Sequence, residues 1–218
     1  ILYKYLENIY AFCYLYRSLL KWCGMDPPKF FQKLLAALIF WGASAASYFF
    51  IPYLIFIEPT EMPYMALDKM IPFWPWTIII YLSLYAQVIL MFLSVKQAAE
   101  FRALFLVYMA CGAILSGFYL FLPTVHNFPY IFDDFVLWLR GIDVAANQFP
   151  SGHTIYSLTG PFFFLAIGRV RLGLVFLTWG LMISASTLTV KQHNVVDVMA
   201  GLFLAIICGL ILGKIILK

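Results

Sequence analysis

Long apolar runs alternate with short polar segments along most of this chain. Six runs reach or approach the ~20 residues that an α-helix needs to cross the hydrocarbon layer of a bilayer. They cover residues 34–57, 74–95, 103–122, 153–168, 172–190 and 195–216. The fourth run is the shortest, and it reaches spanning length only if its helix begins within the preceding SGHT segment. The pattern predicts an all-α, polytopic membrane protein folded as a six-transmembrane-helix bundle.

The first 33 residues depart from this pattern. Tyrosine, leucine and isoleucine are mixed there with charged residues, which are Lys4, Glu7, Arg17 and Lys21. This mixture is typical of an amphipathic helix that lies in the interface between lipid and water, and the proline pair at 27 and 28 would end it. The sequence predicts an N-terminal interfacial segment over residues 1–33, followed by one six-helix transmembrane domain over residues 34–218.

The composition agrees with a membrane location. Hydrophobic residues make up 64% of the chain and charged residues only 11%, and the mean hydropathy is +0.93. These values lie far from those of water-soluble domains, so the composition excludes an ordinary soluble fold. The four cysteines have neither metal-ligand nor disulfide-framework spacing.

The basic residues are distributed unequally between the two sides of the predicted bundle. With six spans, one side holds eleven of them: Lys4, Arg17, Lys21, Lys29, Lys33, Lys96, Arg102, Arg169, Arg171, Lys214 and Lys218. The other side holds Lys69, Arg140 and Lys191. Because loops retained in the cytoplasm are enriched in Lys and Arg, we expect both termini there. The net charge of +4 therefore reflects topology, and we expect no nucleic-acid partner.

The segment "NQFPSGHT" at residues 147–154 is polar and directly precedes an apolar run. Pro150 suits the first turn of a helix, Ser151 can present its hydroxyl, and Gly152 lets exposed N–H groups approach a ligand closely. These features indicate phosphate contacts. The simpler alternative is a helix cap in which Ser151 caps the helix and His153 is merely exposed.

A second polar segment, "KQHNVVDV" at residues 191–198, precedes the last span. His193 and Asp197 are four residues apart and share one face of a helix. A carboxylate at this spacing can fix the tautomer of the histidine and leave its other nitrogen free as a base or nucleophile. The alternative is an ordinary interfacial histidine beside a satisfied aspartate. The predicted topology places His153 and His193 at the same, outer face.

Together these segments resemble the type 2 phosphatidic acid phosphatase superfamily over roughly residues 70–213. The family's second motif, Pro-Ser-Gly-His, is intact at residues 150–153. The third motif is met at Ser186, His193 and Asp197, but Thr187 stands where the family has Arg. The first motif, Lys, six residues, Arg-Pro, is not recognisable; the chain reads "FLPTVHNFP" at its place.

The resemblance implies a membrane-embedded lipid phosphatase or phosphotransferase that needs no metal and no cofactor. His193 would attack phosphorus to form a phosphohistidine, Asp197 would orient His193, and His153 would protonate the leaving alkoxide. The six-helix domain would then be the catalytic domain. Its partners would be a lipid phosphate or phospholipid and the bilayer itself. The active site would face the periplasmic or exoplasmic side of a bacterial inner membrane or its equivalent.

The resemblance also implies a phosphate-binding set. Ser151, the N–H of Gly152 and Ser186 would hold the non-bridging oxygens. Since the motif Lys and Arg residues are missing, Lys191 would supply a cation. His126, Asn127, Arg140 and Thr154 are further candidates for substrate contacts.

Other functions remain open from the sequence. A site with few cations suits a singly charged phosphodiester, and Thr154 agrees with the Ser-Gly-His-Thr segment of sphingomyelin and inositol phosphorylceramide synthases, which transfer head groups. A catalytically degenerate member would bind lipid without chemistry. A transporter is the weakest alternative, because no pair of helices shows the mid-membrane breaks that line substrate pathways.

Overall fold

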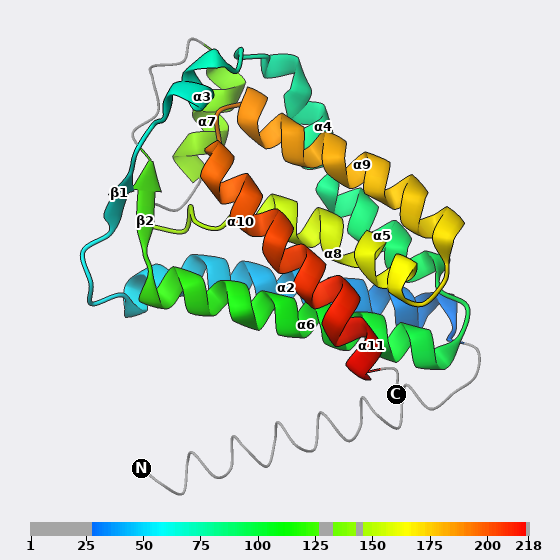
Figure 1. Ribbon diagram of the computed structural model, residues 1–218. Helices are drawn as coiled ribbons and strands as arrows, with labels where there is room; N and C mark the ends of the chain where they lie inside the picture. Colours follow the sequence, from blue (N-terminus) through cyan, green and yellow to red (C-terminus); the bar gives the residue numbers. More distant parts are fainter. Residues whose placement is uncertain (1–27, 127–132, 143–145, 217–218) are drawn as a thin grey trace, which may run out of the picture.

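The computed structural model describes residues 28–126, 133–142 and 146–216 (Figure 1). The predicted interfacial helix falls mostly on residues 1–27, which lie outside the described residues. Asn127 also lies outside the described residues. The longer helices are α2 (Phe30–Phe50), α5 (Leu84–Ser94), α6 (Ala98–Phe121), α7 (Asp134–Ile142), α8 (Gly152–Ala166), α9 (Val170–Thr189) and α10 (Val195–Ile206). The short elements are η1 (Ile51–Leu54), β1 (Thr60–Met62), α3 (Ala66–Met70), η2 (Pro75–Thr77), α4 (Ile78–Leu82), β2 (Thr124–His126), η3 (Ile207–Leu212) and α11 (Gly213–Ile216).

Five helical stretches of the described chain are long and apolar enough to cross a membrane. They are Phe30–Leu54, Pro75–Ser94, Ala98–Phe121, Val170–Thr189 and Val195–Ile216. These stretches correspond to five of the six predicted spans. The sixth corresponds to α8, which has 15 residues and a length of about 22 Å at the α-helical rise. The membrane-protein class is therefore supported, whereas the count of six spans is not confirmed.

Helix α8 is enclosed by other helices of the bundle. It packs against α5, α6, α9 and α10, and every residue from Thr154 to Pro161 is buried. Glycines allow the closest approaches. A Cβ at Gly180 of α9 would lie 2.6 Å from the carbonyl oxygen of Ser157 in α8, and one at Gly209 would lie 2.5 Å from that of Thr159. Side chains larger than glycine at these positions would push the helices apart.

An aromatic cluster fastens α2 to the rest of the bundle. Phe40 of α2 makes edge-to-face contacts with Tyr108 of α6 and Tyr156 of α8, each with ring centroids 5.0 Å apart. Such pairs stabilise beyond their buried area by about 0.5–1.5 kcal/mol each. The contacts fix the position of α2 against α8, which carries the SGHT segment at its start.

The two short strands mark one end of the bundle, called here the strand end (Figure 1). β1 and β2 pair in parallel, with Thr60 opposite Thr124 and Met62 opposite His126, and Asn147 adds an isolated bridge to Thr124. The opposite end carries an ion pair between Arg169 and Glu100 at 2.8 Å. Since α8 begins at the strand end and α9 returns to it, the starts of α8 and α10 both lie there.

Candidate active site

The SGHT segment and the segment before α10 meet at the strand end. The backbone N–H of Ser151 donates a hydrogen bond to the carbonyl oxygen of Asp197 at 3.2 Å. The imidazole rings of His153 and His193 have centroids 6.4 Å apart. The structure thus brings together the two histidines that the sequence singled out, although 40 positions separate them along the chain.

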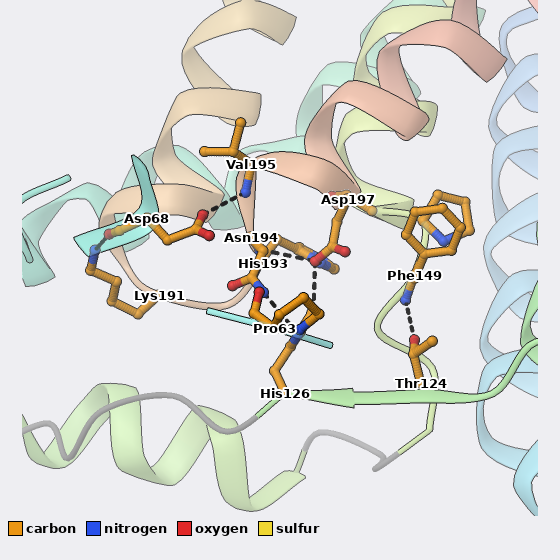
Figure 2. Close-up of polar contacts among 12 residues, drawn as sticks. Pro63, Asp68, Thr124, His126, Phe149, Lys191, His193, Asn194, Val195 and Asp197 are labelled. Carbon is orange, nitrogen blue, oxygen red and sulfur yellow. Dashed lines mark hydrogen bonds and ion pairs between the residues drawn. The ribbon is translucent and has the colours of Figure 1, made fainter. Parts of the chain in front are cut away.

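His193 lies in the turn between α9 and α10 and is 8% exposed. Its backbone N–H donates to the carbonyl oxygen of Thr187 at 3.2 Å, and its Nδ1 lies 3.3 Å from Oδ2 of Asp197 (Figure 2). The same Oδ2 accepts the backbone N–H of Asn194 at 2.9 Å, because the carboxylate closes the first turn of α10 as a cap. This arrangement puts the proton of His193 on Nδ1 and leaves Nε2 with its lone pair.

A third histidine completes the group around Asp197. Nε2 of His126, at the end of β2, lies 2.6 Å from Oδ2 of Asp197. The side-chain amide of Asn194 lies 3.2 Å from Nδ1 of His126. An amide nitrogen only donates, so Nδ1 of His126 accepts and Nε2 carries the proton that faces Asp197. One carboxylate oxygen therefore accepts hydrogen bonds from His126, His193 and Asn194 (Figure 2).

The side chains of His126, His193 and Asp197 are also of the types that bind metal ions, and their ligand atoms lie within 4.8 Å of one another. A shared ion would hold each ligand atom at a bond length of about 2.0–2.2 Å and keep neighbouring ligands apart. The 2.6 Å contact between His126 and Asp197 is instead the length of a charge-assisted hydrogen bond. We therefore describe the group as a hydrogen-bond network.

His153 is held by stacking. Its ring lies against Tyr81 of α4, with centroids 3.8 Å apart and planes inclined by 21°. Its Nε2 is buried and has no hydrogen-bond partner among the described residues. A buried ring nitrogen without a partner is available for proton transfer to a bound group. Sequence reasoning did not single out Tyr81, because an aromatic residue in an apolar run is ordinarily a packing residue.

The predicted hydroxyl ligands are engaged in local hydrogen bonds. Oγ of Ser151 accepts the N–H of Thr154 at 3.3 Å and its hydroxyl at 3.2 Å, as an N-cap residue does. The hydroxyl of Ser186 donates to the carbonyl oxygen of Ile183 at 2.6 Å. The structure therefore shows Ser151 in the capping arrangement that the sequence left as the alternative. Thr154 is fully buried beneath it.

Gly152 forms part of the cavity wall beside His153. A Cβ at this position would lie 3.1 Å from the hydroxyl oxygen of Tyr119 and 3.3 Å from a methyl of Leu115, so the wall has little room for a larger residue. The N–H of His153, at the start of α8, has no acceptor among the described residues, whereas the backbone of Gly152 is hydrogen-bonded to the hydroxyl of Tyr119. Free N–H groups at a helix start favour an anion.

Lys191 and Arg140 contact backbone carbonyls. The ammonium of Lys191 donates to the carbonyl oxygens of Asp68 at 3.0 Å and Ile71 at 2.6 Å. The guanidinium of Arg140, in α7, donates to the carbonyl oxygen of Lys191, and burial lowers the pKa of Arg140 from its usual value. Thr187, at the position of the family's Arg, is fully buried and donates to the carbonyl oxygen of Ser184.

Asp68 is a structural residue of the site that sequence reasoning missed. It is 2% exposed; its Oδ1 accepts the backbone N–H of Val195 at 2.8 Å and its Oδ2 that of Met65 at 2.9 Å. Asp68 thereby fastens α3 to the start of α10, next to His193 (Figure 2). The available signal was that Asp68 lies in a predicted loop on the same side of the membrane as the start of the last helix. Sequence spacing alone does not show which helix Asp68 caps.

A cavity of about 320 Å³ lies beside the histidines. Its wall comes from α2, α4, α5, α6, α8 and residues 147–148, and both His153 and His193 reach it. Trp41, Tyr85 and Tyr156 form an aromatic group within the wall, with Trp41 4.7 Å from Tyr85 and 5.9 Å from Tyr156 between centroids. Among the described residues that line it, none is Lys, Arg, Asp or Glu.

The comparison with protein families covers this part of the chain. No curated protein and no solved structure matches the chain. The model of the PAP2 superfamily matches residues 105–218, just over half of the chain. The match begins within α6 and includes β2, the SGHT segment and the start of α10, and hence His126, His153, His193 and Asp197, whereas Asp68 and Tyr81 lie outside it. With its Pro-Ser-Gly-His motif and its His193–Asp197 pair assembled in one site, the chain belongs to the PAP2 superfamily.

Proposed function

We propose that this protein is a membrane-embedded lipid phosphoesterase or phosphotransferase that works through a phosphohistidine at His193. PAP2 proteins are generally phosphatases and phosphotransferases. The observation that carries the proposal is the pairing of Nδ1 of His193 with Asp197, with the ring of His153 6.4 Å from that of His193 between centroids. A nucleophile oriented by a carboxylate and a second histidine opposite it are the two groups that phosphoryl transfer through a covalent intermediate requires.

The reaction proceeds in two steps. In the first, Nε2 of His193 bonds to phosphorus as the ester P–O bond breaks, and protonated His153 gives its proton to the leaving alkoxide. In the second, neutral His153 takes a proton from water, whose oxygen attacks phosphorus as the P–N bond breaks. If an alcohol replaces water, the same step transfers the phosphoryl or phosphorylated head group to that alcohol.

The start of α8 supplies the anion contacts in this proposal. The N–H group of His153 is free for a non-bridging oxygen, and the positive end of the helix dipole favours negative charge there. Fixed N–H groups stabilise the charge of the transition state because they need no reorganisation during the reaction.

Head-group transfer from a phosphodiester is the second candidate. The lining of the cavity has histidines and amides but no Lys or Arg among the described residues, and the cations nearest in sequence, Lys191 and Arg140, contact backbone carbonyls. A phosphomonoester brings up to two negative charges and a phosphodiester one, so a site without these cations penalises the diester less. This charge balance favours a sphingolipid-type head-group transferase over a simple monoester phosphatase.

The active site faces the outer side of the membrane in this proposal. The strand end holds Lys69, Arg140 and Lys191, and the remaining Lys and Arg residues are assigned to the other side by the span order. The rule that basic residues stay in the cytoplasm then directs the strand end outward.

The proposal is tested with the purified full chain in nanodiscs. Paired lipid monoesters and diesters are incubated with and without ceramide or diacylglycerol, and phosphate, phosphorylated head group and new lipid are each measured. We expect product with the wild type and none with His193→Gln. A lipid-binding protein without chemistry gives no product from any lipid in either case, which would overturn the proposal.

A further inference from the structure

Tyr81 is the aromatic residue in contact with the proposed general acid. Its ring lies against the imidazole of His153, with centroids 3.8 Å apart and planes inclined by 21°, and both residues line the cavity. The ring of His193 lies farther away, with its centroid 6.4 Å from that of His153. Tyr81 is outside residues 105–218, which the family model matches, so no role for it follows from the family.

Helix α4, which carries Tyr81, is fastened to the end of α9 just before the turn that holds His193. The backbone N–H of Trp74 donates to the carbonyl oxygen of Thr189 at 3.0 Å, and the hydroxyl oxygens of Thr77 and Thr189 are 2.7 Å apart. Tyr81 follows Thr77, the N-cap of α4, by four residues, so the two side chains share one face of the helix. These contacts set the position of the Tyr81 ring relative to both histidines.

The ring of Tyr81 is also enclosed by the protein. It is 7% exposed, and it packs in a small hydrophobic cluster with Ile78, Val136 of α7 and Val190. Because protein interiors are close-packed, the ring cannot turn away from His153 without displacing these residues. The imidazole of His153 is therefore stacked on a rigid partner, which fixes the plane of its ring.

The proposed reaction requires His153 to be an imidazolium when the ester bond breaks. Among the described residues, no Asp or Glu forms an ion pair with His153, so no carboxylate neutralises this charge. A cation within about 6 Å of an aromatic ring, over its face, is attracted by the ring quadrupole, and the attraction is stronger where water is excluded. The buried face of Tyr81 meets both conditions and favours the charged form of His153.

We propose, on the basis of the proposed function, that Tyr81 is the positioning residue of the general acid. Its ring holds the plane of the imidazole and stabilises the imidazolium. The proton then passes from Nε2 of His153 to the ester oxygen as the P–O bond breaks and Nε2 of His193 bonds to phosphorus. In the second step the same contact holds neutral His153 in place to take a proton from water. The ring face of Tyr81, and not its hydroxyl, carries this role.

Pairs of substrates with different leaving groups test this role with the full chain in nanodiscs. Phosphatidic acid is paired with p-nitrophenyl phosphate, and phosphatidylcholine with p-nitrophenyl phosphorylcholine. Both members of a pair leave the same group on His193, but the lipid leaves as an alkoxide that needs a proton, whereas p-nitrophenolate does not. The rates of phosphoenzyme formation and of product release are measured for the wild type, Tyr81→Leu and Tyr81→Phe. Tyr53→Leu makes the same change at a tyrosine of η1 that is 84% exposed and is the matched control.

We expect Tyr81→Leu to slow phosphoenzyme formation from the lipid member by about tenfold, since the imidazolium loses its aromatic contact. The rate with the p-nitrophenyl member should stay within about twofold of the wild type. The phosphoenzyme should then accumulate, because its hydrolysis still needs His153 as the base. Tyr81→Phe keeps the ring and should keep both rates, and Tyr53→Leu should match the wild type. A merely structural defect would slow both members together and would not accumulate the phosphoenzyme.

A substitution that preserves the ring covers the case in which Tyr81→Leu does not fold. Tyr81→pentafluorophenylalanine fills nearly the same space as Tyr81→Phe, but its fluorines withdraw negative charge from the face of the ring. Since the attraction to a cation depends on that charge, the fluorinated variant should be slower than Tyr81→Phe with the lipid member and equal to it with the p-nitrophenyl member.

The outcomes separate the role of Tyr81 from the proposed function. Equal slowing of both members by Tyr81→Leu overturns the inference, and so do wild-type rates in a folded Tyr81→Leu protein or equal lipid rates for Tyr81→Phe and the fluorinated variant. Product from the wild type without a phosphoenzyme overturns the proposed function, and the same comparison of product rates then decides the role of Tyr81. No product from any substrate with the wild type overturns both.

Discussion

Nε2 of His126 lies 2.6 Å from Oδ2 of Asp197, closer than Nδ1 of His193, which lies 3.3 Å from the same oxygen. His126 reaches the carboxylate because β2 pairs with β1, and the amide of Asn194 sets its tautomer. Asp197 is thus oriented by a residue from outside the recognisable motifs. In the proposed mechanism His126 is a positioning residue, because it acts on the nucleophile through Asp197.

The first prediction concerns this positioning role. His126→Ala removes one of the donors to Asp197, which lets the carboxylate rotate away from His193, and we expect kcat to fall about tenfold or more. KM should change little, because His126 is not among the residues lining the cavity. His126→Gln places an amide N–H near the position of Nε2 and should restore much of kcat. A rise in KM without rescue by Gln would instead indicate direct substrate binding by His126.

The second prediction separates the roles of the two catalytic histidines. With a lipid analogue that carries a p-nitrophenyl leaving group, His153→Asn should still form a phosphoenzyme, because such a group leaves without protonation. His193→Ala should form none. Rapid quenching followed by mass spectrometry of the peptide containing residue 193 measures the label. Labelling of His193→Ala, or equal turnover of natural lipids by His153→Asn and the wild type, would contradict these roles.

The third prediction concerns Lys191. Its ammonium joins the carbonyls of Asp68 and Ile71, and hydrogen bonds to a charged group contribute about 1.5–3 kcal/mol each. Lys191→Met should therefore lower the melting temperature, with little change in the ratio of monoester to diester turnover. Lys69→Met is the matched control, because Lys69 is exposed in the same segment. An unchanged melting temperature with selective loss of monoester turnover would show that Lys191 binds phosphate.

The fourth prediction concerns sidedness. In a background without Cys13 and Cys23, a cysteine at Lys69, at the strand end, should react with an impermeant thiol reagent in intact cells. One at Arg171, near the opposite end, should react only after permeabilisation. Both positions are exposed, and the two remaining cysteines, Cys111 and Cys208, are buried. The reverse labelling pattern would place the active site in the cytoplasm.

The lengths and composition of the apolar runs determined which parts of the chain form the bundle. Backbone N–H and C=O groups in lipid must form hydrogen bonds within their own segment. A long apolar run without charged residues therefore forms a helix. Five runs follow this rule in the described chain. The sequence likewise predicted the contact of His193 with Asp197, but His193 lies in the turn before α10, and the carboxylate reaches it because it caps the first turn of that helix.

Tertiary structure alone decided the surroundings of those groups. Whether α8 faces lipid or protein depends on which helices enclose it, and a 15-residue apolar run is compatible with either. His126 and Asp197 are 71 residues apart, and the register of two three-residue strands brings them together. A shift of that register by one residue would turn His126 to the other side of its strand.

The same distinction between local spacing and long-range packing explains the contacts of Ser151, Lys191 and Asn147. The sequence shows that each can donate or accept a hydrogen bond, but many partners lie within reach of a polar side chain, and the nearest backbone groups are fixed only by the fold. Ser151 caps its own helix, Lys191 holds α3, and Asn147 donates to the carbonyl oxygen of Tyr48 in α2. Local spacing thus determined the helices and the His193–Asp197 pair, whereas long-range packing decided which polar groups face the substrate.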